Sequence, residues 1–446
     1  MAAPLLVQAP APAADLLIWD AHVLDPRSGI DGRHDVLIRA GEIAEIAPAG
    51  TLTAPEGTET IEAAGRHLFP AFVDPHVHLR VPGQEHKEDL ESGTRAAAAG
   101  GFCAVLAMPN TDPVVDSAPL LRSLRDTAAT DARIPVGFVP AITRGLNGTE
   151  MTEMAELRAE GAAGFTDDGR PVVSAGMLRK ALQYQRLCGG IIALHEEDPS
   201  LSGKGAMHEG EVSALLGVTG IPSISESTMI ARDAMIAGYE GGRIHIQHLS
   251  ARESVQAVAD AKARGVQITC EASPHHLTLT HEAVRTLDTR MKMNPPLRDE
   301  ADRQALIEGL RSGVIDCIAT DHAPHARDEK EVPFEQAPMG TTGLETAFAA
   351  VYTNLVLTGD LPLALVVQRL SDGAALFDLP TPSIATGEQA NVTLIDLDRE
   401  WTVGDGGYES RSANCCFDGQ TLRGKVLLTV AAGTMAFRAR QFEVAA

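Results

Sequence analysis

The sequence predicts an α/β protein: a (β/α)8 TIM barrel joined to a small β-sandwich domain that is built from both ends of the chain. Between residues 67 and 380, short apolar segments alternate with helical stretches, which is the pattern of β-α-β units and a parallel sheet. Eight such segments occur in roughly 300 residues, the count and length typical of a barrel. Polar side chains that carry chemistry follow most of these segments, as expected at one rim of a barrel.

The barrel strands are predicted from short apolar runs bounded by turn residues. They are His67–Val77, Phe102–Met108, Ile134–Pro140, Gly164–Thr166, Ile191–Leu194, Arg243–Gln247, Val266–Glu271 and Cys317–Ala319. Helices are predicted between them from apolar residues that recur every three or four positions. Examples are Asp89–Ala99, Met151–Glu160, Met177–Leu187, Glu226–Ala237, Glu253–Arg264 and Arg298–Arg311.

A doubly wound open sheet is the structural alternative to the barrel. Such a sheet normally has fewer strands, and its first strand-to-helix turn often carries a Gly-x-Gly-x-x-Gly motif. That motif does not occur at the corresponding turn of this sequence. The strand count therefore favours the barrel.

The sequence pattern at the two ends of the chain differs from that of the middle and predicts short strands separated by turns. Strands are expected at Asp15–Leu24, Asp35–Arg39 and Gly41–Ala47, and again at Ala390–Asp396, Gly424–Thr429 and Thr434–Arg438. Neither group is long enough to bury a core alone, so we expect the two to form one small β domain. The predicted organisation is 15–66 and 381–440 for this domain and 67–380 for the catalytic barrel.

Composition excludes several classes of function. Lys and Arg number 37 against 60 Asp and Glu, a net charge of −23, which argues against nucleic acid and anionic membranes as partners. No apolar run reaches the roughly 18 residues that a transmembrane helix needs. The six cysteines form no CxxC pair and suit a reducing cytoplasm. The Ala- and Pro-rich first fourteen residues are expected to form a mobile tail.

Histidines and carboxylates at the predicted strand ends indicate a metal site. His76 and His78 are two residues apart on a strand and therefore share a face. Other polar side chains follow later strands: Asp167 and Asp168 compete for one inward position, and His195, His248 and Asp321 end three more. Four imidazoles and two carboxylates suit Zn²⁺, and six ligands allow two ions that share a carboxylate.

The remaining histidines are expected to have structural roles. His245 lies within a strand and is predicted to be a core residue or to support a ligand. His275 and His276 precede an apolar turn, which favours a loop packed against the barrel. His208, in a Gly-rich segment, is expected to shape its loop.

Several motifs together resemble class I dihydroorotases of the amidohydrolase superfamily, over about residues 15 to 438. They are Asp74-Pro75-His76-Val77-His78-Leu79-Arg80, Met108-Pro109-Asn110-Thr111, Phe165-Thr166-Asp167-Asp168-Gly169, His195-Glu196-Glu197-Asp198, Gln247-His248-Leu249-Ser250, Ser273-Pro274-His275-His276-Leu277, Met293-Asn294-Pro295-Pro296-Leu297-Arg298, Thr320-Asp321-His322-Ala323-Pro324-His325 and Gly343-Leu344-Glu345-Thr346. The arginine that follows the second histidine of the HxH motif is the feature that resembles dihydroorotase within the superfamily.

The resemblance implies a role for each matching residue. His76 and His78 would hold a first Zn²⁺ with Asp321. Asp168 would bridge to a second Zn²⁺ held by His195 and His248, so that each subunit carries one or two ions. The substrate-binding set implied by the resemblance is Arg80, Asn110, Asn294 and His325, with backbone near Met339 and Gly340 closing over the substrate.

The implied activity is the reversible cyclisation of N-carbamoyl-L-aspartate to L-dihydroorotate in de novo pyrimidine biosynthesis. Bound Zn²⁺ would lower the pKa of water to about 7 and supply the hydroxide that attacks the ring amide. Asp321 would carry the proton between water and the ring nitrogen. Arg80 would bind the substrate carboxylate through two hydrogen bonds, as lysine cannot.

The sequence is also compatible with three other functions. A dihydropyrimidinase or allantoinase would act on a ring without the carboxylate and would not need Arg80; many superfamily relatives also have a carboxylated lysine where this chain has Asp168. A catalytically inactive scaffold for aspartate transcarbamoylase would typically lack the metal histidines. A metal-dependent deaminase is a third rival. The sequence leaves open a homodimer and a complex with aspartate transcarbamoylase.

Overall fold

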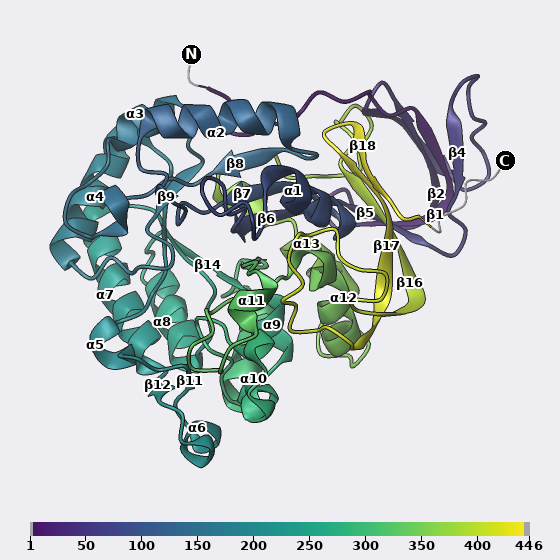
Figure 1. Ribbon diagram of the computed structural model, residues 1–446. Coiled ribbons are helices and arrows are strands. Elements are labelled where there is room, and N and C mark those ends of the chain that lie inside the picture. The colour runs from purple at the N-terminus through teal and green to yellow at the C-terminus, as the bar shows by residue number, and fades with distance from the viewer. Residues whose placement is uncertain (1–2, 441–446) are drawn as a thin grey trace.

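The computed structural model describes residues 3–440 and combines a barrel with a β domain at its side (Figure 1). Eight short strands form the barrel, paired in parallel with their neighbours in sequence order. They are β6 (Phe72–Val77), β7 (Phe102–Ala107), β8 (Val136–Phe138), β9 (Gly164–Thr166), β10 (Ile191–Leu194), β13 (Ile244–Ile246), β14 (Ile268–Ala272) and β15 (Cys317–Ile318). Single bridges from Val77 to His322 and from Phe138 to Ala162 close the circle. The predicted barrel is confirmed.

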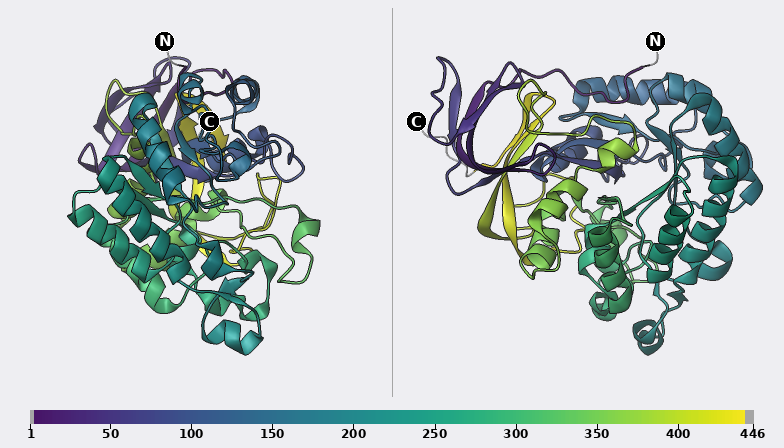
Figure 2. Two further views of the ribbon diagram at one scale, coloured as in Figure 1. Left: turned by 90° about the vertical axis from the view of Figure 1, so that its left-hand side faces the viewer. Right: turned by 180° about the vertical axis from the view of Figure 1, so that it is seen from behind.

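Helices on the outside of the barrel connect successive strands (Figure 2). The longer ones are α1 (Leu90–Ala99), α2 (Ala118–Asp131), α4 (Ala175–Cys188), α7 (Ile224–Glu240), α8 (Arg252–Ala263) and α10 (Glu300–Ser312). Local sequence fixes their ends: Asp89 and Ser92 form a capping box at the start of α1, and Asp299 caps α10. Gly100 ends α1, where a Cβ would lie 2.1 Å from the Leu344 carbonyl oxygen.

Shorter helices lie between the longer ones or follow α10. They are α3 (Met154–Ala159), α9 (Pro274–Thr278), α11 (Arg327–Lys330), α12 (Ala347–Val351), α13 (Leu363–Arg369) and α14 (Gly373–Leu376). After β10 the chain forms an arm that projects from the barrel, with α6 at its tip (Figure 1). The arm comprises α5 (Pro199–Ser202), β11 (Met207–His208), α6 (Glu211–Leu216) and β12 (Gly220–Ile221).

Both ends of the chain contribute to one eight-stranded sheet. Its order is β18-β17-β16-β5-β1-β2-β3, with β4 paired to β1. The strands are β1 (Leu16–Asp25), β2 (Ile30–Arg39), β3 (Glu42–Pro48), β4 (Glu59–Glu62), β5 (His67–Pro70), β16 (Val392–Thr402), β17 (Thr421–Ala431) and β18 (Thr434–Arg438). One apolar cluster, with Ile18, Val36 and Leu428 fully buried, fills the inside of this sheet.

The predicted strand His67–Val77 is in fact two strands that belong to different sheets. β5 pairs with β1 and β16 in the terminal sheet, whereas β6 pairs with β7 in the barrel. The change of partner follows Pro70, the last residue of β5: the Phe72 amide donates to Gly101 next to β7. Each sheet is thereby tied to the other through one continuous stretch of backbone.

Aromatic and charged contacts fix the terminal sheet against the barrel. Phe348 stacks on Phe72 at the start of β6 and lies near Phe69 of β5, with ring centroids 5.7 and 5.8 Å apart. Arg27 donates to Ser371 at 2.8 Å and pairs with Asp372 at 2.5 Å. The core is therefore continuous from the barrel into the sheet.

The expectation of a mobile N-terminal tail is wrong for residues 3–14. Val7 exchanges two backbone hydrogen bonds with Val136 of β8, and the Ala9 amide donates to Ala132. Leu5, Leu6 and Val7 also pack against the main core. The segment lies along the barrel and then reaches the terminal sheet (Figure 1). Its backbone groups form hydrogen bonds and its apolar side chains pack against the core, whereas a free tail would leave both exposed to water.

No helix within residues 3–440 is both long and apolar enough to span a membrane. In the same part of the chain all six cysteines are free thiols, and five of them are buried.

Candidate metal centre and substrate cavity

The residues predicted from the strand ends, and those implied by the family resemblance, surround one cavity of about 310 Å³ at the barrel rim. Eleven of the twelve predicted residues line it: His78, Arg80, Asn110, Asp168, His195, His248, Asn294, Asp321, His325, Met339 and Gly340. The twelfth, His76, is fully buried and contacts Asp168 and Asp321 of this lining. Gly169 and Ala323 complete the lining.

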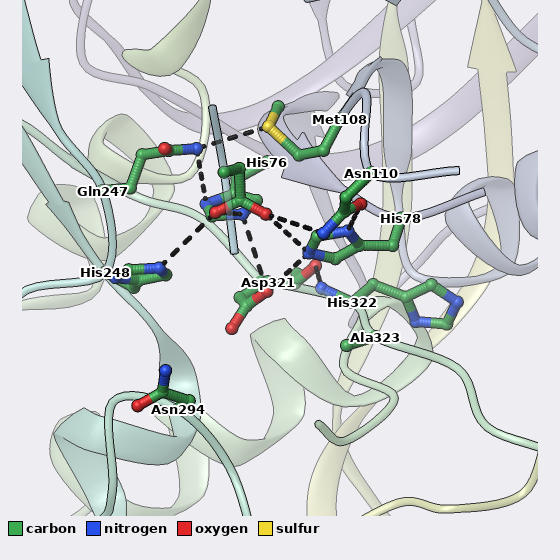
Figure 3. Close-up of polar contacts among 12 residues, drawn as sticks. His76, His78, Met108, Asn110, Gln247, His248, Asn294, Asp321, His322 and Ala323 are labelled. Atoms are coloured by element: carbon green, nitrogen blue, oxygen red, sulfur yellow. Dashed lines mark hydrogen bonds and ion pairs between the residues drawn. The ribbon is translucent and has the colours of Figure 1, made fainter. Parts of the chain in front are cut away.

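The innermost cluster consists of two histidines and two carboxylates. His76 Nε2 lies 3.5 Å from Asp168 Oδ1 and 3.6 Å from Asp321 Oδ1. His78 Nε2 lies 3.1 Å from Asp321 Oδ1 and 3.5 Å from Asp168 Oδ2. Figure 3 shows His76, His78 and Asp321 converging, with His248 facing them from the next part of the rim.

A second histidine pair adjoins the same carboxylate. His195 Nδ1 lies 2.8 Å from His248 Nε2, and each of these nitrogens is 3.7 Å from Asp168 Oδ1. Asp168 therefore lies between the two histidine pairs. Its neighbour Asp167 turns away and accepts the backbone amides of Ile142 and Thr143 at 2.9 Å, so only Asp168 faces the cavity.

The donor set fits a divalent cation such as Zn²⁺. Ligand atoms of His76, Asp168 and His248 lie within 4.8 Å of one another, and so do those of His76, His78 and Asp321. His76 Nε2 is buried and, among the described residues, has no hydrogen-bond partner, although it faces two carboxylates. Imidazole nitrogen and carboxylate oxygen are the atoms that Zn²⁺ takes in proteins.

The electrostatics of the cluster also favour a cation. Burial alone would raise the pKa of Asp168, but the neighbouring histidines hold that pKa well below its usual value. Burial would likewise raise the pKa of Asp321, and the hydrogen bond with His78 and the histidine charges lower it instead. Both carboxylates are thus ionised at neutral pH, with little solvent to screen them.

Three site residues have strained backbone conformations. Arg80, His248 and Asp321 have φ angles of +61°, +35° and +48°, in the left-handed region that residues other than glycine rarely adopt. Such strain concentrates at functional sites, where the surrounding structure enforces it. Each of the three residues lies two or three positions after the end of a barrel strand.

Hydrogen bonds on the far side of the imidazoles orient three of the four histidines. His76 Nδ1 lies 2.6 Å from Glu271, His78 Nδ1 lies 2.8 Å from Asn110 Oδ1, and His195 Nε2 lies 3.4 Å from Glu197. Burial would raise the pKa of Glu271, but the two histidines beside it lower that pKa to about 2. Neither Glu271 nor Glu197 was predicted as a site residue.

Asn110 and Asn294 have partners within the site. Asn110 bonds to His78 as above, and its amide nitrogen lies 3.3 Å from Asp168. Asn294 donates to Glu197 at 2.6 Å and lies 3.4 Å from His195 Nε2. Both amides therefore connect the metal-binding histidines to the rest of the cavity wall.

Arg80 and His325 form the opposite wall. Arg80 is buried, its Nε donates to the Pro324 carbonyl at 3.1 Å, and burial lowers its pKa to about 10, so it stays charged at neutral pH. His325 Nε2 donates to the Met339 carbonyl at 2.8 Å and lies 3.5 Å from the Arg80 guanidinium. Burial and the charge of Arg80 lower the pKa of His325 to about 3, so this imidazole is neutral.

Two buried lysines hold the loop that contributes Met339 and Gly340. Lys292 donates to the carbonyls of Glu335 and Ala337, and Lys330 donates to that of Pro338, all within 2.9 Å. At Gly340, where φ is +133°, a Cβ would lie 2.7 Å from that of Ala323. Neither lysine was predicted as a site residue, because each bonds to backbone carbonyls, which every residue has.

Three other histidines lie outside the cavity lining. His276 bonds to Ser273 and to the Pro295 carbonyl, next to Asn294. His245 bonds to Thr269 and Glu271. His208 groups with Asp299 and Asp302 near the projecting arm, outside the cavity lining.

Comparison with known families gives two matches that together span most of the chain. A family model described as dihydro-orotase-like matches residues 65–254, and the amidohydrolase family model matches residues 226–436.

Similar proteins and structures agree with these families. A dihydroorotase of Pelotomaculum thermopropionicum is 43% identical over 426 residues, covering 95% of this chain and 99% of the relative. One from Anaeromyxobacter sp. (strain K) is 45% identical over 421 residues, covering 94% and 96%. The solved L-hydantoinase (dihydropyrimidinase) of Arthrobacter aurescens superposes with a TM-score of 0.84 at 25% identity, covering 97% of this chain and 98% of that one.

Zn²⁺ added to metal-free protein is expected to raise the midpoint of thermal unfolding. A ligand that binds only the folded chain stabilises it by about 2.7 kcal/mol at a hundredfold excess over Kd. Asp168→Asn should lose most of this rise, because Asp168 adjoins both histidine pairs. Fluorescence-monitored unfolding with and without Zn²⁺ measures the effect.

His208→Ala is the matched control, because it removes a histidine from a His/Asp group outside the cavity. Its response to Zn²⁺ should equal that of the unaltered protein. A response lost in His208→Ala and kept in Asp168→Asn would contradict the assignment of the metal centre.

Proposed function

The chain belongs to the dihydroorotase family, and on that premise we propose that it interconverts N-carbamoyl-L-aspartate and L-dihydroorotate. One observation carries the choice of substrate: a buried, charged arginine, Arg80, lines the same cavity as the metal-binding cluster. L-dihydroorotate is a cyclic amide with a carboxylate on its ring. Its binding site therefore needs a cationic group in the same cavity as the groups that act on the amide. The planar guanidinium suits a carboxylate with two parallel hydrogen bonds.

In the proposed metal centre, each of the two histidine pairs binds one ion. His76, His78 and Asp321 would hold the first Zn²⁺, His195 and His248 the second, and Asp168 would lie between them. When bound, Zn²⁺ would supply a Lewis acid for the amide carbonyl and lower the pKa of water to about 7.

Asp321 is the residue proposed to move the proton. Ring opening takes a proton from the attacking water and delivers one to the ring nitrogen that leaves. The Asp321 carboxylate is ionised because its pKa is lowered, faces the cavity, and is held by His78 at 3.1 Å. It can therefore accept the first proton and donate it to the nitrogen, and cyclisation follows the same route in reverse.

The outer wall of the cavity would bind the substrate. Arg80 would take the ring carboxylate, with Asn294 and the neutral His325 as further hydrogen-bonding groups. Backbone at Met339 and Gly340 would contact the ring, since the lysine-held loop brings both residues to the cavity. Asn110 would act mainly through His78 and Asp168, its neighbours in the cluster.

The rival functions have less support. Hydantoinases and dihydropyrimidinases share the fold, but hydantoin and dihydrouracil lack a ring carboxylate to pair with Arg80. A catalytically inactive scaffold would not need all four histidines and both carboxylates around one cavity, as found here. A deaminase substrate would likewise leave Arg80 without a partner.

Location and partners form a separate part of the proposal. Free, buried thiols support a cytoplasmic enzyme. A homodimer and a complex with aspartate transcarbamoylase belong to the same proposal.

The proposed function is tested by following the ultraviolet absorbance of L-dihydroorotate after adding Zn²⁺-loaded protein. Hydantoin, dihydrouracil and allantoin are assayed in parallel. Selective turnover of dihydroorotate, abolished by a chelator and restored by Zn²⁺, is the expected result. Faster turnover of a ring without the carboxylate would overturn the proposal.

Arg80→Lys is the companion variant for substrate choice. It keeps the charge but loses the planar pair of donors, so binding of dihydroorotate should weaken by about 1–3 kcal/mol. The KM for dihydroorotate should rise accordingly. An unchanged KM would show that another group binds the carboxylate.

Asp321→Asn is expected to lower kcat by about 10²–10⁴-fold, the range for loss of a general acid–base group. The variant is assayed at saturating Zn²⁺, and its metal content is measured to separate lost chemistry from lost metal. Turnover at the unaltered rate with metal bound would exclude Asp321 as the proton carrier.

A further inference from the structure

A carboxylate beneath the metal-binding cluster, Glu271 of β14, is not explained by the proposed reaction. Its side chain is 1% exposed, so it reaches neither the substrate cavity nor solvent. A buried charge is costly unless several groups bond to it. The partners of Glu271 therefore indicate what its charge does.

Both oxygens of Glu271 are engaged by residues of neighbouring strands. Oε1 lies 2.6 Å from His76 Nδ1 and accepts the backbone amide of His248 at 3.2 Å. Oε2 lies 2.9 Å from His245 Nε2, and His245 Nδ1 lies 2.9 Å from Thr269 Oγ1. One carboxylate thus joins a histidine of each proposed metal position to a chain of hydrogen bonds inside the barrel.

The contact with His76 decides which nitrogen of that imidazole is free. A carboxylate only accepts hydrogen bonds, so Nδ1 of His76 carries a proton. The lone pair that a metal can take is therefore that of Nε2, the atom that faces Asp168 and Asp321. A hydrogen bond from the second nitrogen of a metal-binding histidine fixes its tautomer and its ring orientation and makes it a better ligand.

The contact with His248 acts on the backbone. His248 has a φ angle of +35°, which its own conformational preference opposes. The amide that donates to Glu271 belongs to this strained residue, so the bond helps to hold it in place. From that backbone the imidazole reaches toward His195 and Asp168.

We propose that Glu271 is a positioning residue for metal binding, which fixes the tautomer of His76 and the strained backbone of His248. The inference rests on the metal centre of the proposed function but not on the identity of the substrate. His245 helps to hold Glu271 in place through a hydrogen bond to its second carboxylate oxygen. Neither residue touches the substrate cavity.

The test is the affinity of metal-free protein for Zn²⁺, measured by competition with a chromophoric chelator. Glu271→Gln keeps the shape of the side chain but removes its charge, and its single amide oxygen can accept a hydrogen bond from His76 or from His245 but not from both. The expected result is a 10–100-fold weaker affinity, the usual effect of losing such a partner. Excess Zn²⁺ should restore most of kcat with little change in KM, because the substrate contacts are intact.

Glu196→Gln is the matched control. Glu196 is similarly buried, at 2% exposed, and adjoins Asp233 of α7 rather than a metal-binding imidazole. This variant should bind Zn²⁺ as the unaltered protein does, even where its unfolding midpoint falls. Equal Zn²⁺ affinities in Glu271→Gln and the unaltered protein would overturn the proposal and leave Glu271 a structural residue.

A second measurement needs no variant at Glu271 and so holds if Glu271→Gln fails to fold. In Zn²⁺-loaded protein with ¹⁵N-labelled histidine, NMR should show the His76 proton on Nδ1, assigned by its loss in His76→Asn. A proton on Nε2 would overturn the proposal. Both readouts are independent of dihydroorotate turnover, so failure of the proposed function would not be mistaken for failure of this inference.

Discussion

The constraint on which the site depends is the burial of two ionised carboxylates at the mouth of the barrel. Asp168 and Asp321 have side chains only 3% and 9% exposed, so water screens them little. Charge of this kind is stable in a protein only when it is paired or coordinates a metal. The four imidazoles around them are the pairing groups, and His76 Nε2, which has no hydrogen-bond partner within residues 3–440, marks where a cation fits.

Much of the surrounding structure serves to hold these groups together. Parallel strands end at one rim, so residues far apart in the chain meet there. Arg80, His248 and Asp321 keep strained backbones at that rim, and the hydrogen bonds of Glu271, Asn110 and Glu197 set the orientation of three imidazoles. The same rigidity places the charged Arg80 opposite the cluster, where we propose that it selects a ring that bears a carboxylate.

Local patterns were sufficient to predict the barrel and the histidines and carboxylates at its rim, whereas the substrate-binding residues, such as Arg80 and Asn294, were implied only by the resemblance to dihydroorotases. Apolar runs mark the strands, and the polar residue after each run marks the rim. Glu271 was missed for a physical reason: it lies 195 positions from His76, within a strand whose other residues predict only a core. Lys292 and Lys330 bond to backbone carbonyls, which no side-chain pattern predicts. The N-terminal segment was predicted to be mobile from its Ala- and Pro-rich composition. That composition does not show that Val7 pairs with Val136 of β8, a residue far away in the sequence.

Anomalous X-ray diffraction at the zinc absorption edge, on crystals grown with Zn²⁺, is the decisive test of the proposed metal centre. A peak is expected between the His76–His78 pair, Asp168 and Asp321, with any second peak beside His195 and His248. Zinc bound only elsewhere, such as beside His208, Asp299 and Asp302, with these six side chains free of metal, would contradict it.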